Sequence, residues 1–113
     1  MKEYKGMIIL ESLEDKDFLS KLDVISIKAT DEPEPNDRWH IYTVKVSQEE
    51  ILELEKIIKQ GWYAHFWNGK EVIAVFRNKT FSFVHNNKST WKPAVNYGLS
   101  LGISREQLDF PID

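Results

Sequence analysis

The chain has 113 residues, of which 42% are apolar and 29% charged, a composition typical of one globular domain with a single hydrophobic core. The absence of cysteine excludes disulfides, zinc–cysteine sites and thiol nucleophiles. The net charge of −3 argues against a general nucleic-acid binder, although residues 61–113 alone carry a net +2. The longest apolar run, Met7–Leu10, is far shorter than a membrane-spanning helix and no signal-type segment is present, so we expect a cytoplasmic protein with no membrane partner.

The N-terminal part of the chain predicts a β-α-β unit. Residues 5–10 are apolar at nearly every position, as in a central strand, and Ser12 to Asp15 has the Ser-x-x-acid pattern of a helix start. The short helix that follows buries three apolar side chains, those of Phe18, Leu19 and Leu22. Residues 24–29 then alternate as a second strand.

A third strand and a longer helix are expected next, after an exposed connection at residues 30–38 that is rich in acids and proline. Residues 39–46 alternate between two faces. One face carries His40, Tyr42, Val44 and Val46, and the other carries Trp39, Ile41, Thr43 and Lys45. Ser47 and Glu50 form a capping-box pattern at the start of a helix over residues 48–60, and Gly61 fits the left-handed position after it.

The strongest local signal is the dipeptide Asn68-Gly69, which predicts a β-hairpin between residues 62–67 and 70–76, because both residues tolerate the positive φ of a type I′ turn. This turn pairs Trp67 with Lys70 and His65 with Val72. Residues 80–84 then complete a three-stranded meander.

The C-terminal part predicts one more helix. Thr90 is its expected cap, Pro93 is tolerated in its first turn, and Gly102 ends it. Ser104 to Gln107 repeats the capping-box pattern over a short final turn.

Together these elements predict a single α+β domain over residues 1–113. The expected sheet is mainly antiparallel with about six strands, in the order β-α-β-β-α-β-β-β-α, and its helices pack mostly on one face. The first part of this order resembles a ferredoxin-like split β-α-β core with an added hairpin and C-terminal helix. Because such folds serve many functions, a function has to be argued from the site.

Two stretches of the chain, GWYAHFWNGKEVIAVF (61–76) and STWKPAVNYGLSLGISREQLDFPI (89–112), resemble those of a family of short prokaryotic proteins with no assigned activity. The resemblance covers most of the chain. It implies a free-standing domain in a bacterium or archaeon, and it carries no catalytic residues over to this sequence.

Aromatic residues crowd into two segments of the chain more densely than half-buried strands require. They are Trp39, Tyr42, Trp62, Tyr63, Phe66 and Trp67. One interpretation is that these side chains are core, since aromatic residues are favoured in strands. The other is that they form an apolar second face of the sheet, which a small molecule or a second copy of the chain would cover.

The leading hypothesis is therefore a non-catalytic binding domain, which we expect to be a homodimer. Its binding face would consist of Tyr63, His65 and Trp67, joined by His40 and Tyr42, and would hold an aromatic or apolar small molecule or a protein partner.

The alternative hypothesis is a small enzyme. In it, His65 or His40 is the general base and Arg77 or Lys92 holds an anionic substrate.

Other kinds of site find little support in the sequence. The three histidines lack metal-ligand spacing and the five glycines leave no phosphate loop, so no metal or cofactor is expected. The four acids of the 30–38 connection are interpreted as solvated; they are Asp31, Glu32, Glu34 and Asp37. Basic residues interleaved with Phe81, Phe83 and Trp91 keep a single-stranded RNA-binding module as a further alternative, although the acidic overall charge argues against a nucleic-acid partner.

Overall fold

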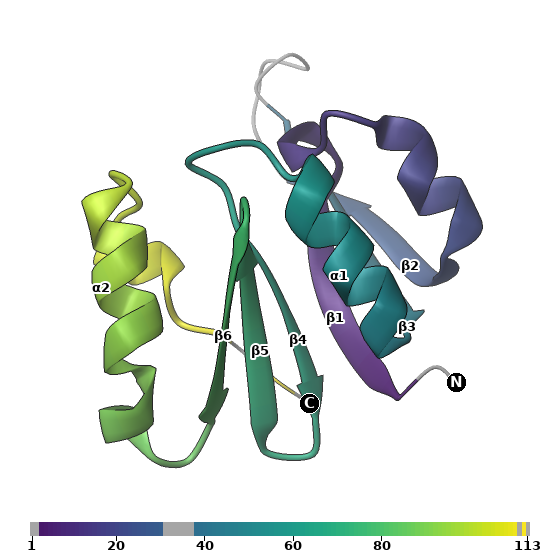
Figure 1. Cartoon of the computed structure of the whole chain (residues 1–113). Helices are drawn as coiled ribbons and strands as arrows, with labels where there is room; N and C mark the ends of the chain where they lie inside the picture. Colours follow the sequence, from purple (N-terminus) through teal and green to yellow (C-terminus); the bar gives the residue numbers. More distant parts are fainter. Residues whose placement is uncertain (1–2, 31–37, 111, 113) are drawn as a thin grey trace.

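A six-stranded antiparallel sheet dominates the computed structural model, which describes residues 3–30, 38–110 and 112 (Figure 1). The strands are β1 (Tyr4–Ile9), β2 (Asp23–Ala29), β3 (His40–Val46), β4 (Ala64–Asn68), β5 (Glu71–Phe76) and β6 (Lys79–Val84). They lie side by side in the order β2-β3-β1-β4-β5-β6, and every neighbouring pair is antiparallel. The α+β class and the six-stranded sheet predicted from the sequence are confirmed.

Two α-helices and several short 3₁₀ helices accompany the sheet in the described part of the chain. They are η1 (Leu10–Ser12), η2 (Lys16–Lys21), α1 (Gln48–Ile57), η4 (Lys88–Trp91), α2 (Lys92–Ser100) and η5 (Arg105–Gln107). None of the described helices is long and apolar enough to cross a membrane. Most of the predicted connection at residues 30–38 lies outside the described residues.

The connection from β1 to β2 is formed by η1 and η2, where the sequence predicted one short helix. Ser12 does not cap it, because its hydroxyl donates to the carbonyl oxygen of Ile9 at 2.6 Å. Asp15 caps η2 instead, accepting from the Asp17 amide at 3.1 Å. The predicted apolar face is nevertheless buried, since Phe18 and Leu19 are core residues.

Helix α1 begins where the sequence predicted and ends earlier. The Ser47 side chain accepts from the Glu50 amide, and the Glu50 side chain accepts from the Ser47 amide, so the capping box is confirmed. The helix ends at Ile57 because the backbone of Ile58 becomes extended and forms an isolated bridge with Leu13. This bridge ties the end of α1 to the connection after β1.

The β4–β5 hairpin is present, but its predicted register is wrong by two residues. The turn residues are Gly69 and Lys70, Trp67 pairs with Val72, and Gly69 has a φ of 62°. Glycine at the first central position is typical of a type II′ turn rather than the predicted type I′ turn. Because side chains alternate with a period of two, the two-residue shift leaves the predicted faces unchanged.

One face of the sheet, called the first face below, packs against α1, η1 and η2. Its core includes Ile8 of β1, Val44 of β3 and Phe66 of β4, together with Ile51 and Leu54 of α1. All five side chains are at most 2% exposed. Of the two described α-helices, only α1 packs on this face, because the residues of α2 belong to the core of the opposite face.

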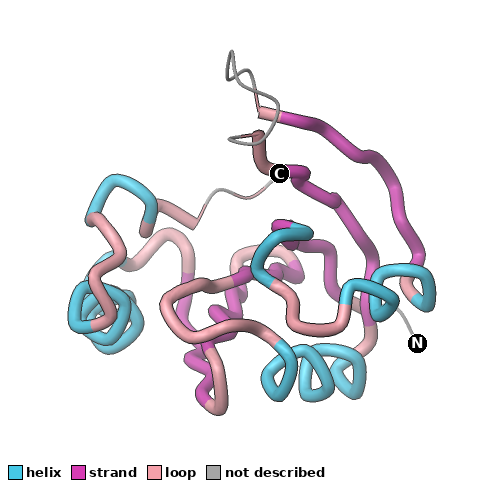
Figure 2. Tube along the Cα trace, turned by 90° about the horizontal axis from the view of Figure 1, so that it is seen from above, coloured by secondary structure: helices cyan, strands magenta, loops and turns pink. Residues whose placement is uncertain are grey.

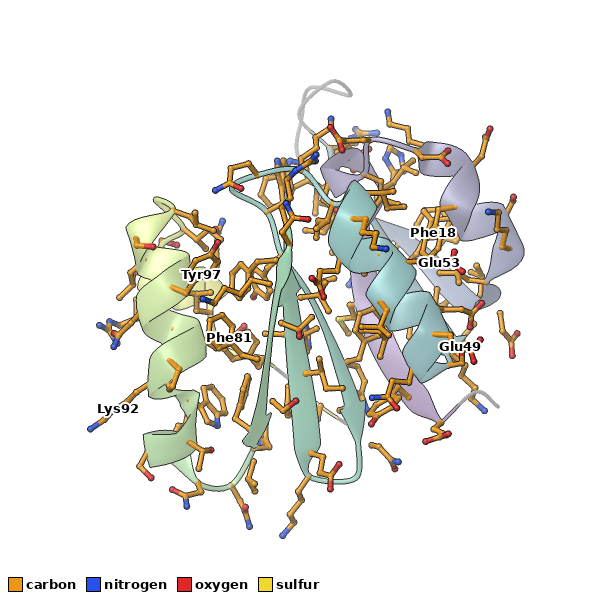
Figure 3. All side chains as sticks on the ribbon, viewed as in Figure 1. Phe18, Glu49, Glu53, Phe81, Lys92 and Tyr97 are labelled. Atoms are coloured by element: carbon orange, nitrogen blue, oxygen red, sulfur yellow. The ribbon has the colours of Figure 1, made fainter. Side chains whose placement is uncertain are left out.

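The opposite face, called the second face, is covered over β4, β5 and β6 by α2 and by residues 101–110, which we call the C-terminal segment (Figures 1 and 2). Alternate residues of β5, Val72, Ala74 and Phe76, point into this second core. Tyr97 of α2 contacts Phe76 and Phe81, with ring centroids 5.0 and 5.5 Å apart (Figure 3). The hairpin is therefore buried on both faces.

The second face over β1, β3 and β2 is less covered. The second core includes Met7 of β1 but no residue of β2 or β3. Ile9 and Ile41, which are register partners on β1 and β3, are only half-buried. The second face thus has a closed half over β4–β6 and an open half over β1, β3 and β2.

Candidate functional site

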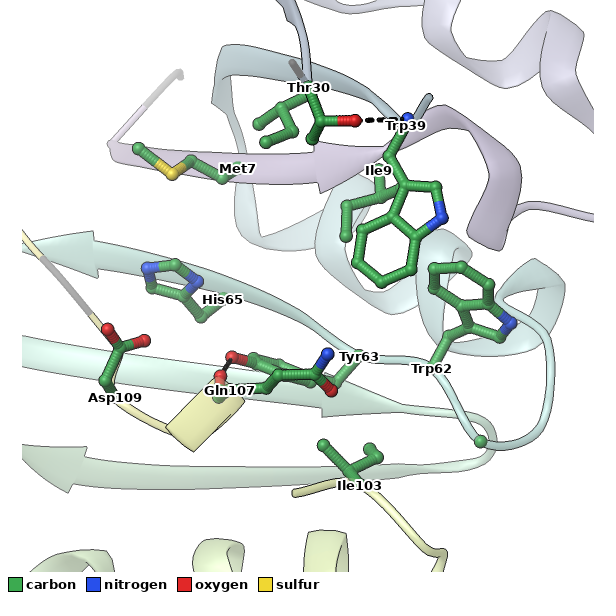
Figure 4. Close-up of a pocket in the computed structure, with 12 residues that line it drawn as sticks. Met7, Ile9, Thr30, Trp39, Trp62, Tyr63, His65, Ile103, Gln107 and Asp109 are labelled. Atoms are coloured by element: carbon green, nitrogen blue, oxygen red, sulfur yellow. Dashed lines mark hydrogen bonds between the residues drawn. The ribbon is translucent and has the colours of Figure 1, made fainter. Parts of the chain in front are cut away.

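An apolar pocket lies at the boundary between the closed and open halves of the second face (Figure 4). Its volume is about 340 Å³, which is at the lower end of the range typical of small-molecule sites. Met7, Ile9 and Ile41 form its floor on β1 and β3. Its other lining residues come from the ends of the β2–β3 connection, the loop before β4, β4 itself and the C-terminal segment; they are Thr30, Trp39, Gly61, Trp62, Tyr63, His65, Ile103, Gln107 and Asp109.

Two indoles form one end of the pocket. The rings of Trp39 and Trp62 meet edge to face, with centroids 5.1 Å apart. The Thr30 amide donates to the carbonyl oxygen of Trp39 at 2.9 Å and the Trp39 amide donates to Thr30 Oγ1 at 2.8 Å, which holds the first indole just before β3. Trp39 is still 37% exposed, so a large apolar ring faces solvent at this end.

The other end of the pocket is more polar. The Tyr63 hydroxyl donates to the carbonyl oxygen of Gln107, which ties the start of the hairpin to the C-terminal segment. Burial raises the pKa of Tyr63 above its ordinary value of 10.0, and the nearby charge of Asp109 raises it further. The buried imidazole of His65 lines the same end (Figure 4).

Phe110 anchors the C-terminal segment, which forms one wall of the pocket. This side chain is fully buried, and its ring lies 5.0–6.0 Å, between centroids, from those of Tyr63, His65, Phe83 and Trp91. Its φ of 43° lies in the left-handed region, which costs a non-glycine residue on the order of 1–3 kcal/mol. The aromatic contacts therefore stabilise a locally unfavourable backbone.

The structure brings only part of the predicted binding face together. Tyr63 and His65 line the pocket, with ring centroids 6.4 Å apart. Trp67 shares their face, but it is only 5% exposed and belongs to the second core. It also lines a second hollow beside the hairpin turn, together with Asn68 and Gly69.

His40 and Tyr42 do not join this face. They alternate with Ile41, and Tyr42 packs against the core of the first face, so the other side of β3 faces the pocket. The sequence predicted the two faces of this strand correctly but not which of them lies beside Tyr63. The prediction that His40 and Tyr42 share a binding face with Tyr63 is therefore corrected.

His40 pairs with Glu11 on the first face. Its Nδ1 lies 2.8 Å from the Glu11 carboxylate, which also accepts from the His40 amide. Partial burial of Glu11 raises its pKa, but the hydrogen bonds from the His40 amide and ring outweigh this and leave that pKa below its ordinary value of 4.5. A carboxylate that orients an imidazole is an arrangement used in general base catalysis, although no pocket-lining residue contributes to this one.

The two basic candidates lie elsewhere. Arg77 forms an ion pair with Glu14, near the end of α1. Lys92, at the start of α2, points away from the sheet (Figure 3) and lines a second groove with Lys88 and Arg105, which shares Asp109 with the apolar pocket. Neither residue lines the apolar pocket.

Several pocket residues lay outside the predicted binding face. Trp39 was named only among the crowded aromatic residues, and Ile41 was not named for the site, although the alternation of residues 39–46 places both on one face. Ile103, Gln107 and Asp109 had no such signal, because they reach the pocket only when the C-terminal segment folds back over the hairpin. Among the described residues, no group of three or more His, Cys, Asp or Glu side chains could hold a metal ion.

Comparisons of the chain with protein-family models, with curated proteins and with solved structures found no match. The function is therefore argued from the pocket alone.

Proposed function

We propose that this chain is a small ligand-binding domain that holds an apolar or aromatic small molecule in the pocket between the indoles of Trp39 and Trp62 and the C-terminal segment. The observation that carries this proposal is the apolar pocket at the boundary between the closed and open halves of the second face. Met7, Ile9 and Ile41 offer a continuous apolar floor that the described part of the chain leaves half-exposed.

The test fills the pocket from its floor. Ile41→Trp places an indole on the floor, and Thr43→Trp places the same side chain on the same face of β3 but outside the pocket lining. Saturation-transfer NMR with 2-phenylethanol should report binding to the wild type and to Thr43→Trp, and none to Ile41→Trp. Equal signals from all three proteins, or none from the wild type, would overturn the proposal.

We also propose that the chain is a homodimer, through the outer edge of β2. This strand is the end of the sheet, and Ile25 and Ile27 on it are 47% and 57% exposed. Exposed apolar edge strands pair readily with other strands. Analytical ultracentrifugation should show a dimer that Ile27→Lys disperses and that Leu52→Lys, at an exposed position of α1, leaves intact; a monomeric wild type would refute it.

We further propose that the chain is a cytoplasmic protein of a prokaryote and that its sheet has a ferredoxin-like core. The strand order β2-β3-β1-β4, with β5 and β6 added beyond β4, supports a split β-α-β core with an extra hairpin.

The enzyme and RNA-binding alternatives are supported less well. The enzyme requires a histidine beside an anion-holding residue, and His65, His40, Arg77 and Lys92 lie in four separate places. The RNA-binding module requires exposed rings for base stacking, whereas Phe83 and Trp91 are at most 5% exposed and belong to the second core.

A further inference from the structure

The two ends of the apolar pocket differ in charge. The indoles of Trp39 and Trp62 lie at one end, and the carboxylate of Asp109 lies at the other (Figure 4). Asp109 is the only residue with a permanent charge among the described residues that line the pocket. No described lysine or arginine lines it to balance that charge.

We infer that the ligand of this pocket is an amphipathic cation, with an apolar or aromatic body against the indoles and a protonated amine near Asp109. This inference rests on the proposed function and adds the charge of the ligand to it.

The indole end selects the body of such a ligand. Trp39 and Trp62 supply two large rings, and Ile9 and Ile41 supply the adjacent floor. The Trp39 amide already donates to Thr30 within the chain, so the contacts offered at this end are mainly apolar. A single ring with a short side chain is of the size that a pocket of about 340 Å³ accepts.

The Asp109 end selects the head group. Asp109 is exposed and no ion pair within the described residues involves it, although it also lines the adjoining groove with Lys88, Lys92 and Arg105. Gln107 adds a backbone carbonyl oxygen that accepts from Tyr63 and can accept a second hydrogen bond. Acceptors and a negative charge at one end of an apolar pocket fit an ammonium group.

An anionic ligand fits the same surroundings poorly. It would bring a like charge toward Asp109 with no described basic side chain on the pocket wall to offset it. The faces of Trp39, Trp62 and Tyr63 are electron-rich, and they also favour a cation over an anion.

The experiment compares three probes that share a phenyl ring and differ in charge: 2-phenylethylamine, 2-phenylethanol and phenylacetate. Dissociation constants are measured by ¹⁵N–¹H NMR titration at low salt. The amine should bind about fivefold more tightly than the alcohol, as expected for one exposed ion pair, and phenylacetate should bind most weakly. High salt should shrink the preference for the amine.

Two variants locate the charge that sets this preference. Asp109→Asn should make the amine and the alcohol bind equally. Glu106→Gln removes the same charge from the same segment at an exposed residue that does not line the pocket, and it should keep the preference.

The outcomes separate the two proposals. If the alcohol binds as tightly as the amine to the wild type, or if phenylacetate binds most tightly, the charge inference is overturned while the pocket still binds ligands. If Asp109→Asn keeps the preference, Asp109 is not its source and the inference is overturned. If none of the probes binds, the proposed function fails and the inference fails with it.

Discussion

The closed and open halves of the second face are built from the same sheet and differ in what covers them. Over β4–β6, α2 and the C-terminal segment bury Ala74, Phe76 and Phe83 to 5% exposure or less. Over β1 and β3, Met7, Ile9 and Ile41 stay half-exposed. The sheet curves between these halves when seen from above (Figure 2).

The covering of the closed half accounts for most of the aromatic residues around the hairpin. Most of the rings around the hairpin fill the closed half, where Phe110 joins them into one cluster. The two indoles at the boundary, Trp39 and Trp62, line the pocket, and Trp62 also packs against the core of the first face. The aromatic density in the sequence therefore corresponds to a second core and to the walls of a pocket.

The largest expected effect comes from opening the closed half. Phe110→Ala removes a fully buried ring and should lower the free energy of unfolding by about 3–5 kcal/mol, whereas Ile41→Ala on the open half should cost only about 1 kcal/mol. Urea denaturation followed by circular dichroism measures both. Equal costs would contradict the difference in coverage between the two halves.

A methyl group between β1 and β4, on the first face of the sheet, should have the next largest effect. A Cβ at Gly6 would lie 2.1 Å from the Phe66 ring and 2.6 Å from the carbonyl oxygen of His65, across the β1–β4 pair. Gly6→Ala should therefore cost about 3 kcal/mol in the same denaturation assay.

Gly98→Ala is the matched control for Gly6→Ala. Its Cβ would meet only the side chain of Leu108, at 2.8 Å, which can move, and alanine gains up to about 1 kcal/mol of helix propensity. We expect a change within about 1 kcal/mol. If Gly6→Ala is tolerated equally well, the close approach of β1 and β4 is not a constraint on the fold.

Removing the tie between the hairpin and the C-terminal segment should have a smaller effect. Tyr63→Phe deletes the hydroxyl that donates to the Gln107 carbonyl oxygen, and should cost about 1 kcal/mol. Hydrogen exchange should show faster exchange in residues 105–108. Unchanged protection there would mean that the bond does not hold the segment.

The same residue predicts a dependence on alkaline pH. Because its pKa is raised in the folded state, Tyr63 contributes stability below pH 10.0 that is lost as the pH rises further, since the unfolded chain releases this proton first. Tyr63→Phe should flatten this loss, as measured by urea midpoints above pH 9. Identical slopes for both proteins would contradict the prediction.

The smallest effect is expected in acid. Glu11 has a folded-state pKa below 4.5, so it contributes stability above that pH that is lost as the pH falls through the lowered value. Glu11→Gln should reduce this loss, while Glu53→Gln, at an exposed position of α1, should not. Thermal unfolding between pH 7 and pH 3 provides the test, and equal behaviour of the two variants would count against the Glu11–His40 contact.

The sequence predicted the elements that depend on neighbouring residues. The capping box of α1 and the three-stranded meander follow from local patterns, and both are present. The hairpin register was missed because the turn takes Gly69 and Lys70 rather than Asn68 and Gly69, a choice that pairing with β1 and β6 also influences.

The pocket was predicted only in part, because its walls come from distant parts of the chain. Tyr63 and His65 could be named, since they share one face of the hairpin. The face of β3 that meets them depends on β3 pairing with β1, and Asp109 arrives only when the C-terminal segment folds back. Neither fact is encoded in a local pattern.

The most direct test of the binding site is a chemical-shift map of the wild-type protein titrated with 2-phenylethanol. Saturable shifts should concentrate at the indole N–H groups of Trp39 and Trp62 and at the amides of Ile9 and Ile41. If the shifts do not saturate, or if they cluster on β2 or α2 instead, the pocket on the second face is not the binding site of this protein.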